Sequence, residues 1–199
     1  MKPTDKTKQF WLMLYAIDAF QNVMWACDSL LKRKPDKSEP TYRSLIAFIL
    51  SNYGRPFHGN HGVGRLDANI VPAEYRSLHD QLIRDRDKIL AHTDTQGIPT
   101  YFGNANQVRL LRLPDSFKWV TSTYISLDDA DNRRIHDLCQ SLTAVLDKRT
   151  DEYERCCLPE IKKLSPGEYL LNTKADESEL FTKVSSILPP NDALNPTPI

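Results

Sequence analysis

The sequence predicts a mainly α-helical protein, a four-helix up-down bundle with a small β-hairpin inserted between the third and fourth helices. Four stretches repeat apolar residues at the three- and four-residue spacing of one helical face. After Pro99, two stretches alternate β-branched and aromatic residues with polar ones. We expect a helical domain over residues 1–158, with the hairpin at about 99–126, and a partly disordered C-terminal extension over 159–199.

The first two helices are separated by a proline-containing linker. Residues 7–33 show the apolar spacing of a long helix, and the stretch "KRKPDKSEP" (32–40) interrupts it. The apolar stripe resumes at Thr41, and Gly54 with Pro56 is expected to end the second helix. The segment that follows contains several glycines and predicts a loop.

The third helix is expected to open at Pro72, a residue favoured at the first helical position, and to run to about Asp94. The segments 107–113 and 117–127 then predict the two strands of the hairpin, with "PDS" as the turn between them.

Ser126 and Asp129 resemble a capping box for the fourth helix. We expect this helix to run to about Cys157, where Pro159 ends or kinks it. A short amphipathic helix is predicted at 177–188, followed by a disordered tail.

Composition excludes several classes of protein. Lys plus Arg and Asp plus Glu each number 26, so any polyanion site must be a local patch rather than a global basic field. No apolar run approaches the roughly 18 residues of a membrane span, and no signal peptide is recognisable, which predicts a cytoplasmic protein. The four cysteines include no C-x-x-C pair, so neither a zinc site on cysteines nor a disulfide framework is indicated.

Arg86 occupies an unusual place on the third helix. On a helical projection it lies in the middle of the apolar stripe, with Leu82 and Leu90 about 40° to either side. A guanidinium there needs a partner, either a structural carboxylate or an anion at a cleft or subunit seam. His92 lies about 120° away, in the last turn, where the helix terminus and Asp85 favour the imidazolium and suit proton transfer. A lone histidine is, however, more often structural.

The stretch "RDKILAHTD" (86–94) resembles the R-x(4 to 6)-H signature of HEPN domains, where the residue after Arg is typically Asp, Asn or His. It is especially similar to the RDKxxAHxD form of bacterial HEPN proteins related to abortive infection and other defence systems. The stretches "YGRPF" (53–57) and "LHDQLIRDRDK" (78–88) are similar to a bacterial group with an RPF element ahead of the RDK element. The resemblance covers at most residues 40–150.

The resemblance implies a metal-independent, cofactor-free endoribonuclease built across a homodimer, a toxin or phage-defence component with an antitoxin or defence partner. Arg86 and His92 would be catalytic, with Asp87 and Asp94 orienting them. Apart from the resemblance, the residue types and positions of Arg55, His58 and Lys88 make them candidates for RNA contact. A two-fold axis would bring two copies of the diverging Arg86 and His92 to one seam. Because many HEPN domains are not nucleases, a catalytically inactive dimerisation or RNA- or protein-binding module is the alternative.

Two other segments contain candidate binding residues. The loop "HGNHG" (58–62) spaces two histidines three apart, which fits either a metal site or phosphate contact, or simply a solvated loop. The hairpin mixes basic and aromatic residues that either stack bases and bind phosphates or cover a core: Arg109, Arg112, Lys118, Trp119 and Tyr124.

Overall fold

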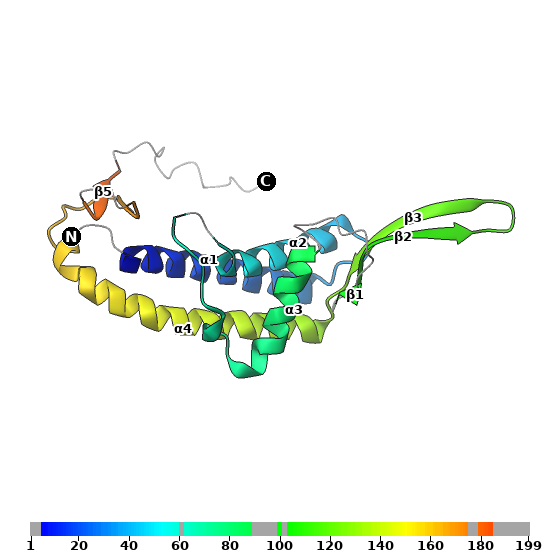
Figure 1. The fold of residues 1–199 in the computed structure, drawn as a ribbon, viewed down its shortest axis with the longest axis horizontal. Helices are drawn as coiled ribbons and strands as arrows, with labels where there is room; N and C mark the ends of the chain where they lie inside the picture. The colour runs from blue at the N-terminus through cyan, green and yellow to red at the C-terminus, as the bar shows by residue number, and fades with distance from the viewer. Residues whose placement is uncertain (1–4, 60–61, 89–98, 101–102, 175–178, 185–199) are drawn as a thin grey trace, which may run out of the picture.

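The structure, a computed structural model, describes residues 5–59, 62–88, 99–100, 103–174 and 179–184. Its body consists of α1 (Asp5–Arg33), α2 (Pro40–Gly54), α3 (Arg76–Arg86) and α4 (Asp129–Ile161). Figure 1 shows α1 and α4 side by side along the length of the molecule, whereas α3 runs steeply across them. The predicted four helices, with a hairpin between the third and the fourth, are confirmed.

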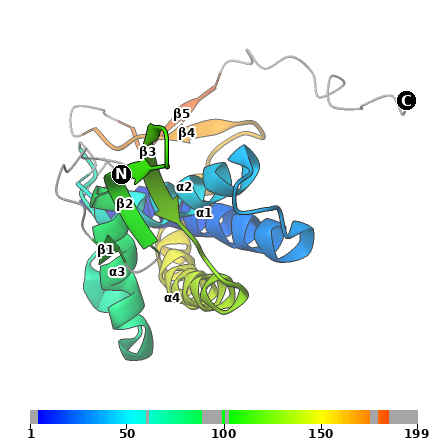
Figure 2. The ribbon, with the colours of Figure 1, turned by 90° about the vertical axis from the view of Figure 1, so that its right-hand side faces the viewer.

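The core lies where α1, α2 and α4 pack together, with α3 packed on α2 (Figure 2). The apolar spacing that predicted the helices faces this core. On α4, for example, five side chains at helical spacing have no exposed surface: Ile135, Leu138, Cys139, Leu142 and Leu146. On α1 the aromatic ring of Phe20 is equally buried and contacts two rings from the end of α2 and the turn after it.

The second helix ends at Gly54, as predicted, but for a different reason. Gly54 has φ −75° and ψ −28°, ordinary right-handed helical values, so no left-handed cap is formed. The chain continues directly into the 3-10 turn η1 (Arg55–Phe57), in which Pro56 is tolerated because it lies in the first turn. A left-handed residue instead follows α1, where Lys34 has φ 44° and its N–H donates to Leu30 O at 3.0 Å.

The segment before α3 contains two further 3-10 turns, η2 (Ala68–Ile70) and η3 (Ala73–Tyr75). The predicted helix start at Pro72 was therefore early, because Pro72 opens η3 and the α-helix begins at Arg76. The predicted continuation of this helix to Asp94 lies outside the described residues, apart from a π-helical turn at 87–88.

The capping box predicted at Ser126 was wrong by two residues. Asp128 is the N-cap residue: its Oδ1 accepts from Asp131 N at 2.7 Å, and Asp131 Oδ2 accepts from Asp128 N at 3.3 Å. Ser126 Oγ instead accepts a hydrogen bond from Lys37. Pro159 lies inside α4 and does not end it, because the helix continues for two more residues, to Ile161.

The inserted hairpin consists of β2 (Gly103–Arg112) and β3 (Phe117–Ile125), with the short β1 (Pro99–Thr100) beside β2. It projects as an arm beyond the end of the helical body (Figure 1). The base of the arm is attached to α2, because Tyr42 OH donates to Leu127 O and accepts from Leu127 N, both at 3.0 Å.

The C-terminal helix predicted at 177–188 was wrong where it can be compared. Phe181–Lys183 is strand β5 and pairs antiparallel with β4 (Tyr169–Leu171). Its partner strand lies ten residues earlier, so the local spacing of apolar residues did not reveal the pairing. The predicted tail over 189–199 lies outside the described residues. Among the described residues no helix is long and apolar enough to cross a membrane.

Candidate functional site

Arg86 ends α3, and its side chain lies directly against Gly54 at the end of α2. A Cβ atom built on Gly54 would be 3.1 Å from Arg86 Cγ and 3.2 Å from Cδ. Because the backbone of Gly54 is ordinary helix, glycine is required here by this close approach and not by backbone conformation. The Arg86 side chain, 24% exposed, therefore has its apolar stem on Gly54 and its guanidinium near the surface.

The guanidinium belongs to a cluster with Asp87 and His58. Arg86 Nη1 donates to Asp87 Oδ1 at 2.8 Å, and His58 Nε2 donates to the same oxygen at 2.7 Å. Burial acts to raise the pKa of Asp87, but the hydrogen bonds and charges of Arg86 and His58 outweigh it, so this pKa lies below its ordinary value. Asp87 is thus a carboxylate at neutral pH, and it orients both a guanidinium and an imidazole.

The stretch "YGRPF" builds the support for this cluster. Tyr53, Pro56 and Phe57 are buried, and the rings of Tyr53 and Phe57 lie 5.6 Å apart, both against Phe20. Gly54 leaves room for Arg86. The 3-10 turn then places His58 beside Asp87.

His79 connects this support to α3. Its Nδ1 lies 2.8 Å from Tyr53 OH, and its ring packs edge-on against Phe57 with centroids 4.6 Å apart. Burial, and to a smaller extent Arg76, lower the pKa of His79 against the opposing effect of Asp80, so His79 is neutral at pH 7. Since burial also raises the pKa of Tyr53, its hydroxyl stays protonated and donates to the imidazole.

We expect His79 to make folding pH-dependent. Its pKa is lowered from 6.5 in the folded chain, so the unfolded state binds more protons between these two values. The contribution of His79 to the free energy of unfolding should therefore be at its maximum above pH 6.5, and it should be lost as the pH falls through the folded pKa. Asp87 acts in a separate window, below its ordinary 3.8.

Urea unfolding from pH 7.5 to about pH 5 measures this effect. In His79→Gln, whose amide still accepts from Tyr53, the decline should shrink. In His136→Gln, a change on the partly exposed face of α4, it should persist. An unchanged decline in His79→Gln would contradict the assignment.

The other predicted site residues are not all brought together. Arg55 lies over the ring of Tyr15 on α1, with its Cζ 5.6 Å from the ring centroid. Lys88 is half-buried in the turn after α3. His92, the predicted acid–base group, and His61 lie outside the described residues, as do the side chains of Arg109 and Tyr124.

Three residues of this region were missed by sequence reasoning. Gly54 was interpreted only as a helix end and Asp85 only as a neighbour of His92, and His79 was assigned no function. Asp85 is 1% exposed, because it follows Leu78 and Leu82 at seven and three residues on the buried face of α3. Arg86 lies at the edge of that face rather than in its middle, and the spacing of Asp85 was the available signal.

A groove of about 520 Å³ borders the supporting residues. His79, Phe57 and Ile83 line one part of it, and the rest is formed by the segment before η2. Its lining is mostly apolar, with Arg65 and Asp67 as the charged members. The groove therefore offers a partly apolar hollow close to the cluster.

Comparison of the chain with protein-family models, with curated proteins and with solved structures found no match.

Proposed function

We propose that the protein is a HEPN-type, metal-independent endoribonuclease that acts as a homodimer, with Arg86 and His92 as its catalytic residues. The observation that carries the proposal is the partly exposed guanidinium of Arg86, held on Gly54 and oriented by Asp87. A cation fixed in advance can stabilise charge that develops on a substrate without reorganising first. The type of reaction, RNA cleavage, is inferred from the resemblance of residues 86–94 to the HEPN signature.

In this reaction a ribose 2′-hydroxyl attacks the adjacent phosphorus. His92 takes the proton of the hydroxyl, and the P–O5′ bond breaks as the 5′-oxygen receives a proton, which leaves a 2′,3′-cyclic phosphate and a 5′-hydroxyl. Arg86 binds the phosphate oxygens while negative charge builds on them. Asp87 keeps Arg86 in place, and His58, bound to the same carboxylate, contacts the substrate with Arg55 and Lys88.

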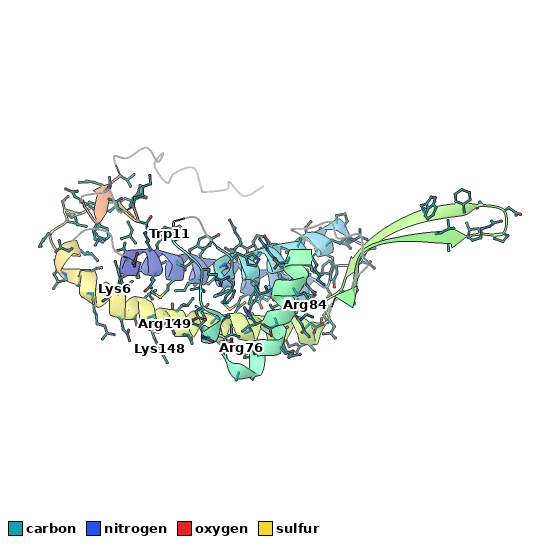
Figure 3. The ribbon with its side chains drawn as sticks, in the orientation of Figure 1. Lys6, Trp11, Arg76, Arg84, Lys148 and Arg149 are labelled. Atoms are coloured by element: carbon teal, nitrogen blue, oxygen red, sulfur yellow. The ribbon has the colours of Figure 1, made fainter. Side chains whose placement is uncertain are left out.

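Basic side chains on three helices support an RNA ligand. Arg76 and Arg84 extend from α3, and Lys148 and Arg149 from α4, with Lys6 on α1 (Figure 3). None of these five forms a salt bridge to a carboxylate within the described part of the chain. Because the net charge of the chain is zero, the positive charge that a phosphate backbone meets has to come from such side chains, which lie at separate places on the three helices.

RNA cleavage in EDTA tests the proposal. The full chain should cut a 5′-labelled single-stranded RNA, and its products should carry cyclic phosphates. Arg86→Ala and His92→Ala should each lower the rate by about 100-fold or more, the usual effect of removing a charge-stabilising or acid–base group. Arg155→Ala and His136→Ala, matched changes on α4, should cleave at the wild-type rate. Cleavage retained in Arg86→Ala would refute the assignment.

The ion pair of Arg86 with Asp87 also favours a second candidate, a catalytically inactive HEPN-like dimerisation or RNA- or protein-binding module. In that case the carboxylate already satisfies the guanidinium, and its role is structural. RNA bound but not cut by the wild type would decide for this alternative.

As a toxin or defence component, the nuclease should arrest bacterial growth when it is expressed, whereas the Arg86→Ala variant should not.

A further inference from the structure

The arm formed by β2 and β3 exposes large apolar side chains near its tip. Leu110 pairs with Trp119 and Arg112 with Phe117, so these four residues share one face of the hairpin. Phe117 is 64%, Trp119 62% and Leu110 52% exposed. A two-stranded hairpin alone is marginally stable in water, and an apolar patch of this kind marks an interaction surface.

The helical body has an exposed stripe of its own on α1, in which the apolar residues Leu14 and Trp25 flank two polar ones. Leu14, Asp18, Gln21 and Trp25 follow one another at intervals of four, three and four residues, and all are exposed. Trp25 is 59% exposed and meets Phe48 of α2 edge-on, with ring centroids 6.3 Å apart. This Trp25 stripe thus has an exposed aromatic pair, Trp25 with Phe48, at one end and polar residues in its middle.

The two surfaces match in charge. Arg112 lies on the same face of the arm as Phe117 and Trp119, whereas Lys118 lies on the opposite face; Asp115 in the turn is the one acidic residue between 110 and 119. Asp18 lies within the Trp25 stripe, and its carboxylate is exposed and bonded only to the neutral side chain of Asn22 among the described hydrogen bonds. Arg112 on the apolar face of the arm would therefore meet an acid on the stripe.

The length of the arm also fits the distance from the end of a second body to its Trp25 stripe. The arm starts at the end of the body where α1 ends, because Lys34, just after α1, pairs with Asp129 at the start of α4 at 3.6 Å. Nine strand residues extend the arm by roughly 30 Å. Trp25 lies eight residues before the end of α1, roughly 12 Å into the body. The arm is therefore long enough to reach the stripe of a second body that meets the first end to end.

We infer that a second copy of this chain covers the arm, and that the two copies exchange arms about a two-fold axis. Each arm face of Leu110, Phe117 and Trp119 packs on the Trp25 stripe of the other copy. Two such contacts bury on the order of 1,200 Å² in total, the lower limit for a stable specific interface. This inference rests on the homodimer of the proposed function and names the contact that holds it together, but it does not depend on RNA cleavage.

Light scattering and sedimentation of the full chain test the exchange. The wild type should be a dimer at micromolar concentration. The double variant Phe117→Ser, Trp119→Ser and the single variant Trp25→Ser should each become monomeric, although they alter opposite sides of the contact. Leu170→Ser, at a site on β4 that is also 62% exposed, should remain dimeric. Arg86→Ala should remain dimeric too, which separates this result from the loss of nuclease activity.

A photo-crosslinking residue in place of Trp119 gives a second readout. It should yield covalent dimers whose linked peptide contains Leu14–Trp25. A monomeric wild type, or a dimer that survives both arm changes, would overturn the inference. A monomer that binds anionic phospholipid vesicles through Trp119 would overturn it as well and would assign the arm to a lipid surface.

Discussion

Replacing Gly54 by leucine is expected to lower RNA cleavage by about 100-fold, as much as removing Arg86 itself. The Cβ of any side chain at position 54 comes within 3.1 Å of Arg86 Cγ, and the remaining atoms of leucine would take the space of the arginine stem. The guanidinium then leaves Asp87. The Cβ of alanine is accommodated when the flexible side chain of Arg86 shifts by a few tenths of an ångström, so Gly54→Ala should keep most of the activity.

Two further measurements distinguish displacement of Arg86 from general damage. Ser44→Leu introduces the same side chain at an exposed site of α2 and should cleave RNA normally. In Gly54→Leu the pKa of Asp87, followed by NMR, should rise, because a hydrogen bond and a positive charge that lower it are lost. Full activity with an unchanged Asp87 pKa would show that position 54 does not control Arg86.

Truncating Leu142 to alanine is expected to lower the free energy of unfolding by about 3 kcal/mol. Leu142 is fully buried on α4 within the core shared with α1, so the change removes apolar contacts and leaves a cavity. Denaturation in guanidinium chloride, with the transition midpoint compared at constant slope, measures the loss.

Leu158→Ala is the matched control on the same helix. Leu158 is 43% exposed, so the same truncation should cost less than about 1 kcal/mol. Equal losses at both positions would mean that α4 does not bury the face described above. Because self-association, where it occurs, makes the free energy of unfolding depend on concentration, both variants are compared at one protein concentration.

The predicted part of the fold depends on short-range spacing. Apolar residues three and four apart on α1, α2 and α4 must lie on one face of a helix, so each helix and its buried face followed from the letters alone. Two predictions failed. Asp128 caps α4, although Ser126, two residues earlier, also has a side chain that can cap a helix. Phe181 lies in a strand and not in a helix because it pairs with Leu171. Both outcomes depend on geometry that a local pattern does not contain.

The candidate site divides in the same way. The sequence by itself determined the helices, the hairpin and the position of Arg86, Asp87 and "YGRPF" as residues of interest, because these follow from periodicity and from a short motif. Only the tertiary structure decided that Arg86 lies on Gly54 and shares Asp87 with His58. Those contacts join residues about thirty positions apart, and they exist only because burial of Tyr53, Phe57 and His79 brings the end of α2 against α3.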